Sequence, residues 1–162
     1  IVPSNKDRFL RKETLQGFVH DEASAFFGGL AGNAGLFSTA RDVARVYQML
    51  LNGGEIDGQR YLSKETCQLF TTETSKISRR GLGFDKPDAD DSKKGNCAPA
   101  APAEVYGHTG FTGTCAWVDP VNELVYVFLS NRIYPDVTNR KLNQLHIRER
   151  IQGAIYDAMK KK

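Results

Sequence analysis

Hydrophobic positions recur at helical spacing in the first third of the chain. Ser38 or Thr39 can cap a helix, with Asp42 three residues after Thr39, and apolar residues follow at positions 43, 46, 47, 50 and 51. This spacing is typical of a helix that buries one face, and it ends at Asn52-Gly53-Gly54. The pattern therefore predicts a helix over Ala40–Leu51.

Two further helices are expected downstream. Ser63 can cap a short one over Ser63–Thr71, with Glu65 in its first turn. The other is predicted over Leu145–Lys160, where apolar residues form one stripe. The stripe consists of Ile147, Ile151, Ala154, Ile155, Ala158 and Met159.

Runs of β-branched and aromatic residues predict strands between these helices. Thr114–Val118 and Leu124–Leu129 are separated by a turn containing Pro120, so they are expected to pair as an antiparallel hairpin. Gly81–Phe84 is expected to be a short strand, and Asp85–Ala103 a surface loop. Because the only clear strand pair is a hairpin, the predicted fold class is α+β, an antiparallel sheet with helices packed on it.

Composition and charge narrow the class of protein. The chain has 162 residues, of which 40% are hydrophobic and 25% charged, which suits one region with its own core. The net charge of +3 is scattered outside a terminal lysine run, so no nucleic-acid partner is expected. No stretch approaches the roughly 20 apolar residues of a transmembrane segment. The chain begins at Ile1 without methionine, and we expect that its parent polypeptide starts further upstream.

Several candidate sites have a simpler structural interpretation. The three cysteines lack a C-x-x-C pair and are expected to be free thiols. The loop Gly28–Gly35 lacks the Lys-Ser/Thr of a phosphate-binding loop, which favours a tight turn. His20 stands beside Asp21 and Glu22, but adjacent side chains point apart, so a structural role is favoured over a metal site. We expect neither metal nor cofactor.

The segment Tyr106–Thr114 is the most informative part of the sequence. Glycines at positions 107, 110 and 113 permit close approach of a ligand or of other backbone, while His108, Thr109 and Thr112 supply an imidazole and two hydroxyls. Such a strand can form the edge of a cleft. A bulged strand without a ligand is an equal alternative.

Three longer motifs carry a resemblance to a known family. His108-Thr109-Gly110 resembles the Lys-Thr-Gly motif of the β-lactamase and penicillin-binding-protein superfamily. Residues 28–45 resemble that family's loop and following helix, and residues 107–120 and 124–132 resemble its strand hairpin. The resemblance is strongest to the class C β-lactamase and esterase branch. The contexts of Val19-His20-Asp21 and Tyr134-Pro135 are also similar to such domains fused behind family 3 glycoside hydrolases.

The resemblance implies a role for each residue of the motif. His108 would replace the lysine that meets a substrate carboxylate and tunes proton transfer near the nucleophile, and Thr109 would offer its hydroxyl to the same carboxylate. The backbone N–H of Phe111 would be one of two oxyanion-hole donors. Gly110 and Thr112 would line the substrate site. The substrate would be a small acyl compound: a β-lactam, a peptide or an ester.

The sequence departs from the family where the nucleophile should be. No serine has a lysine three residues on, and no Y-x-N or S-x-N triplet occurs. We therefore expect that residues 1–162 form the C-terminal portion of the domain, inactive alone, with a parent that is a serine hydrolase. The alternative is a non-catalytic accessory module. A glycoside hydrolase site is disfavoured, because no pair of carboxylates can be assigned to it.

The resemblance leads to one expectation about the surface of the chain and one about its cellular location. The missing portion would cover apolar surface and add strands, so the isolated chain is expected to expose an apolar face or an open sheet edge and to self-associate. The resemblance suggests an exported, periplasmic or cell-envelope setting.

Overall fold

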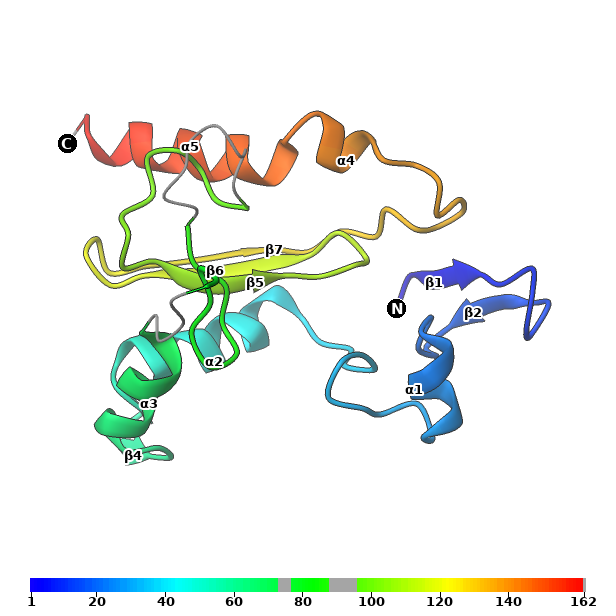
Figure 1. Cartoon of the computed structure of the whole chain (residues 1–162), viewed down its shortest axis with the longest axis horizontal. Coiled ribbons are helices and arrows are strands. Elements are labelled where there is room, and N and C mark those ends of the chain that lie inside the picture. The colour runs from blue at the N-terminus through cyan, green and yellow to red at the C-terminus, as the bar shows by residue number, and fades with distance from the viewer. Residues whose placement is uncertain (73–76, 88–95, 162) are drawn as a thin grey trace.

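A three-stranded antiparallel sheet forms the centre of the molecule (Figure 1). The computed structural model describes residues 1–72, 77–87 and 96–161. The sheet has the order β5-β6-β7, formed by β5 (Tyr106–Thr109), β6 (Cys115–Asp119) and β7 (Leu124–Phe128). Its second hairpin is the one that the sequence predicts, and its antiparallel register pairs Trp117 with Tyr126.

Alternation along β6 separates two faces of the sheet. Cys115 and Trp117 point to one face, where they form a buried core with Val105, Cys97 and Tyr126. Ala116 and Val118 point to the other face. The central strand is buried along its whole length, so helices must cover the sheet on both sides.

Helices lie on both faces (Figure 1). α2 (Ala40–Leu51) packs on β6 and β7 from one side, and α5 (Ile147–Met159) lies across the opposite face. Tyr47 of α2 makes an edge contact with Phe84, which makes another with Tyr106 of β5. The predicted α+β class, with helices packed on an antiparallel sheet, is confirmed.

Two predicted helices begin at the expected caps. The Thr39 hydroxyl accepts a hydrogen bond from the Asp42 N–H at the start of α2, and the Ser63 hydroxyl accepts one from the Thr66 N–H. The second of these helices is α3 (Lys64–Thr71). Side-chain oxygens thus satisfy N–H groups that have no partner within the first helical turn.

The helix predicted at the end of the chain is present over Ile147–Met159, but most of its apolar stripe is not buried. Ile151 and Met159 are exposed, whereas the buried side chains are Arg148, Gln152 and Tyr156. Each of these three makes a hydrogen bond to another part of the fold: to the Thr114 carbonyl, the Ala98 N–H and the Asp119 carboxylate, respectively. Those bonds remove the cost of burying polar groups, so hydrogen bonding orients α5 together with Ile155, the residue of the stripe that packs against the core.

The segment between α3 and β5 also differs from expectation. Gly81–Phe84 forms no strand; instead Asp85 makes an isolated bridge to Gly107. The expected surface loop Asp85–Ala103 is buried at both described ends, where Asp85, Lys86, Cys97 and Ala98 are at most 7% exposed. Residues 88–95 of that loop lie outside the described residues.

The N-terminal segment forms a separate small structure to one side of the sheet (Figure 1). β1 (Pro3–Lys6) pairs antiparallel with β2 (Thr14–Gln16), and α1 (Glu22–Phe26) follows with Asp21 as its cap. None of these elements was predicted. The remaining short elements are β3 (Glu55–Ile56), β4 (Gln59–Arg60) and α4 (Lys141–Gln144).

Large apolar side chains are exposed around this N-terminal segment. Phe26 and Phe27 are each 79% exposed, and Leu36 is 86% exposed. Among the described residues, β7 has no second partner strand. The expected exposed apolar surface and open sheet edge are therefore both present. No helix in the described ranges has the length and apolar character needed to cross a bilayer.

Candidate functional site

The outer edge of β5 is open beyond its midpoint. Gly107 exchanges both of its backbone hydrogen bonds with Asp85, so its N–H and C=O point away from β6. Alternate residues on a strand direct these groups the same way, and Thr109 therefore presents its backbone to the same edge. Gly110, by contrast, bonds inward to the Thr114 carbonyl. Phe111 follows at the end of the open edge.

His108 and Thr109 approach this edge from different faces of the sheet. His108 pairs with Ala116 and Thr109 with Cys115, and adjacent side chains on a strand point to opposite faces. A ligand would meet both side chains only if it lay along the edge itself. His108 Nδ1 lies 2.6 Å from the Thr109 carbonyl oxygen. Because a carbonyl oxygen only accepts, Nδ1 donates this hydrogen bond, and Nε2 is left for another partner.

The turn after β5 is held at several points, yet some of its N–H groups have no acceptor. The Gly113 N–H donates to the Gly110 carbonyl, and the Arg132 N–H donates to the Thr112 carbonyl at 2.8 Å. Ser130 Oγ donates to the Gly113 carbonyl. Within the part of the chain that the structure describes, the N–H groups of Phe111, Thr112 and Thr114 have no acceptor. A fixed turn with unpaired N–H groups has the form of an oxyanion-binding group.

The glycines of the motif are required by the chain's own packing. A Cβ on Gly107 would lie 2.1 Å from the Ala116 carbonyl and 2.7 Å from the Trp117 ring, and a Cβ on Gly110 would lie 2.3 Å from Thr114 Oγ1. Neither distance is compatible with a side chain. The close approach that the sequence indicated is thus made by neighbouring protein groups at these two positions.

Two side chains from distant parts of the chain pack on the Phe111 ring. The His20 ring is stacked on it, with ring centroids 5.4 Å apart and an angle of 8° between the planes. The Arg132 guanidinium lies 4.7 Å from the ring centroid, at cation–π distance. Burial lowers the pKa of His20, which favours its neutral ring. His20 thus belongs to the surroundings of the motif.

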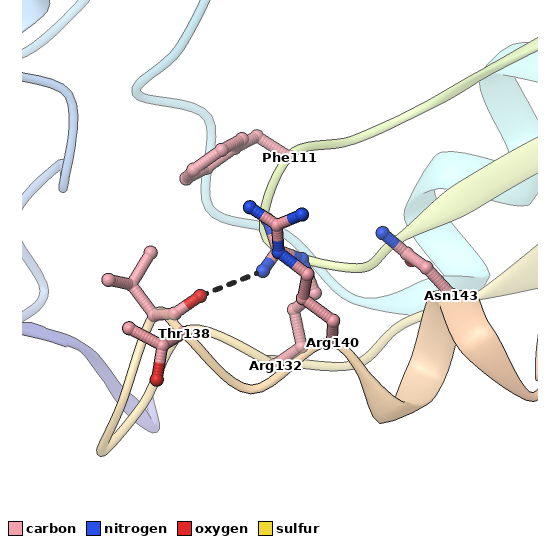
Figure 2. Close-up of a pocket in the computed structure, with 6 residues that line it drawn as sticks. Phe111, Arg132, Thr138, Arg140 and Asn143 are labelled. Carbon is pink, nitrogen blue, oxygen red and sulfur yellow. Dashed lines mark hydrogen bonds between the residues drawn. The ribbon is translucent and has the colours of Figure 1, made fainter.

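A pocket with positive charge opens beside Phe111 (Figure 2). It has a volume of about 370 Å³ and contains no carboxylate among its described lining residues. Its lining consists of Phe111, Arg132, Val137, Thr138, Arg140 and Asn143. Arg132 is fixed by donating a hydrogen bond to the Val137 carbonyl. The buried guanidinium of Arg148 donates from Nη2 to Asn143 Oδ1 at 3.2 Å. The arrangement suits an anion.

The other polar groups offer no alternative nucleophile or metal site. The three cysteines are free and buried, as predicted, and burial raises the pKa of Cys115 to about 11. A thiol with such a pKa is protonated at neutral pH and is a poor nucleophile. In the described ranges no three His, Cys, Asp or Glu side chains are grouped to hold a metal ion.

The glycine-rich loop is a tight turn, as the sequence favoured. Ala31 and Ala34 form a bridge across it, and a Cβ on Gly35 would lie 2.1 Å from the Gly29 carbonyl oxygen. The loop leads from α1 into α2, so it connects the His20 region with the helix that packs under the sheet.

The sequence profile of the beta-lactamase family matches residues 4–149, which include every element of the site described above. The chain belongs to the beta-lactamase family. Its similarity to individual members of that family is limited to one part of their length. A "Putative D-alanyl-D-alanine carboxypeptidase" of Escherichia coli K12 is 37% identical over 135 residues, and proteins of the same description from Salmonella agona and Salmonella typhi are 38% identical.

These alignments cover 83% of this beta-lactamase family chain but only 31% of each relative. The chain thus spans about a third of the length of the curated relatives that it matches. Sequence reasoning identified the motif on β5 but missed Arg132 and Arg140 beside it. The Asn131-Arg132 run after β7 was part of the resemblance, yet nothing in its spacing indicated contact with Phe111, which is a property of the folded chain.

Proposed function

We propose that the chain forms the C-terminal portion of a serine hydrolase domain that cleaves a peptide ending in D-alanyl-D-alanine through an acyl-enzyme. The observation that carries this proposal is the unpaired Phe111 N–H at the open edge of β5, beside His108 and Thr109. Amide hydrolysis passes through a tetrahedral intermediate with a negatively charged oxygen. N–H groups fixed in the direction of that oxygen lower the barrier to its formation.

In the proposed reaction, a serine from the preceding part of the domain attacks the carbonyl carbon, and its proton passes to a neighbouring base. The oxyanion accepts a hydrogen bond from the Phe111 N–H. The C–N bond then breaks, the leaving amine takes a proton, and water later hydrolyses the serine ester. Residues 1–162 contain no serine with a lysine three residues on, so this chain's part would be to hold and polarise the substrate.

The pocket beside Phe111 supports a substrate with a terminal carboxylate. Arg132 and Arg140 both line it, and their positive charges together make the electrostatic potential of the pocket positive. A carboxypeptidase cuts the bond before the last residue of its substrate, and the negative charge is the terminal carboxylate of that last residue. The proximity of an oxyanion donor to an arginine-lined pocket is compatible with that spacing, and the relatives are described as putative D-alanyl-D-alanine carboxypeptidases.

The test uses the extended polypeptide, meaning this chain joined to the preceding part of its domain. His108→Ala should lower the rate of acylation by a fluorescent penicillin about ten- to hundredfold, the loss expected for one charge-assisted contact. Thr112→Ala, the matched control on the same turn, should lower it less. Equal rates for wild type and His108→Ala would contradict the role of the histidine. A wild-type extended polypeptide that is never acylated would favour the non-catalytic module.

A further inference from the structure

The turn that carries the Phe111 N–H is in contact with a part of the chain about ninety residues away in the sequence. The His20 ring lies flat on the Phe111 ring, at a separation typical of an offset aromatic stack. Phe111 is otherwise 60% exposed, so few other contacts restrict its side chain. The Phe111 ring is joined through Cβ to the Cα that follows the N–H, so holding the ring restrains the position of this Cα and with it the peptide group that carries the N–H.

His20 is itself held rigidly. Arg11 donates from Nη1 to the Val19 carbonyl and from Nη2 to the His20 carbonyl, each at 2.8 Å. The Asp7 carboxylate holds Arg11 in turn at 2.7 Å. On the other side, Asp21 caps α1 by accepting from the Ser24 N–H. The backbone before and after His20 is thus fixed by charged groups, more than an exposed loop needs.

The tripeptide Ser130-Asn131-Arg132, which follows β7, links the N-terminal segment to this turn. Ser130 and Arg132 bond to the Gly113 and Thr112 carbonyls, while Asn131 Nδ2 donates to the Pro3 carbonyl at 2.5 Å. The N-terminal hairpin and the turn are therefore fixed to one short segment. Movement of either would strain the same set of hydrogen bonds.

We propose that His20 is a positioning residue of the site: its ring, stacked on Phe111 together with the Arg132 guanidinium, fixes the direction of the Phe111 N–H. The inference rests on the proposed function for its effect on rate, but not for its effect on order. Because the oxyanion forms only in the tetrahedral intermediate and the transition states around it, and not in the bound substrate, loosening its donor lowers kcat and leaves KM unchanged.

The first measurement uses the 162-residue chain alone. With ¹⁵N-phenylalanine label on the nine phenylalanines, the Phe111 amide of wild type should have an order parameter near that of rigid backbone, roughly 0.85. His20→Ala should reduce it toward the flexible range, below about 0.6, and His20→Phe should preserve it. Phe18→Ala, an exposed aromatic in the same loop, is the control and should leave it unchanged.

The second measurement uses the extended polypeptide. His20→Ala should lower kcat about tenfold at unchanged KM, less than the hundred- to thousandfold loss expected from removing an oxyanion donor, and His20→Phe should restore most of it. An unchanged Phe111 amide in His20→Ala, or a His20→Phe variant as impaired as His20→Ala, would overturn the proposal. If the wild type fails to acylate, the proposed function is wrong, and the ¹⁵N comparison still decides whether His20 positions the turn.

Discussion

Large apolar side chains are buried in the sheet, whereas several of those in the N-terminal segment are exposed. In β6, Trp117 and Val118 are at most 1% exposed between two layers of helix. In residues 1–39, Leu15 and Val19 are buried, but the aromatic rings of Phe9, Phe26 and Phe27 are about four-fifths exposed. Polar contacts such as that of Asp7 with Arg11 help to hold this segment. The sheet supplies its own core. The N-terminal segment holds a defined backbone but leaves apolar surface that further protein would cover.

The largest expected effect comes from the core of the sheet. Trp117→Ala should lower the free energy of unfolding by about 3–5 kcal/mol, because the ring is fully enclosed and its loss leaves a cavity. Phe27→Ala is the matched control in the N-terminal segment and should change it by no more than about 0.5 kcal/mol. Urea unfolding of the three proteins measures both. Equal losses would show that the two regions share one core.

The exposed aromatics should control association. Replacing Phe26 and Phe27 with serine should weaken self-association of the chain in sedimentation equilibrium, because their apolar surface is what a second molecule would cover. The urea midpoint should hardly change. Unaltered association would instead point to the open edge of β7 as the surface responsible.

A more local effect is expected at Arg11. Arg11→Ala removes its bonds to the Asp7 carboxylate and to the Val19 and His20 carbonyls, so amide exchange in residues 7–20 should accelerate. Exchange in β6 should stay slow, because the sheet does not depend on these bonds. Arg8→Ala, a neighbouring exposed arginine, is the control. Faster exchange in both regions would contradict their independence.

The smallest effect is the pH dependence contributed by His20. Burial lowers its pKa from the ordinary 6.5; Asp21 opposes this shift, and Arg11 and Arg132 add to it. The unfolded chain therefore binds the proton first as the pH falls, and stability is lost below about pH 6.5 until the folded pKa is reached. His20→Phe should remove this part of the pH dependence in urea unfolding at about pH 7.5 and 5.5. An identical loss in both proteins would exclude His20 as its source.

Local signals predicted the sheet region well and the N-terminal segment poorly. The caps at Thr39 and Ser63 and the spacing in Ala40–Leu51 are set by neighbouring residues, so the sequence contains them. β3 and β4 were missed although Asp57-Gly58, both with positive φ, is a recognised two-residue hairpin turn. β1 and β2 are short, polar and interrupted by a register shift, and no alternation indicates them.

The site divides in the same way. The motif on β5 is continuous in the sequence, and its resemblance to the family led to His108, Thr109 and Phe111. The contacts of His20 and Arg132 with Phe111 join residues far apart along the chain and follow only from the fold. The buried polar side chains of α5 were not predicted for a related reason: the hydrogen-bond partners of Gln152 and Tyr156 lie in distant segments.

We propose that this chain supplies one wall of an acyl-transfer site and no nucleophile. Covalent labelling by a fluorescent penicillin can decide this, with the 162-residue chain and the extended polypeptide compared at equal concentration. We expect no label on the chain alone and stoichiometric label on the extended polypeptide, attached to a serine upstream of Ile1. Stoichiometric label on a residue between Ile1 and Lys162 would contradict it.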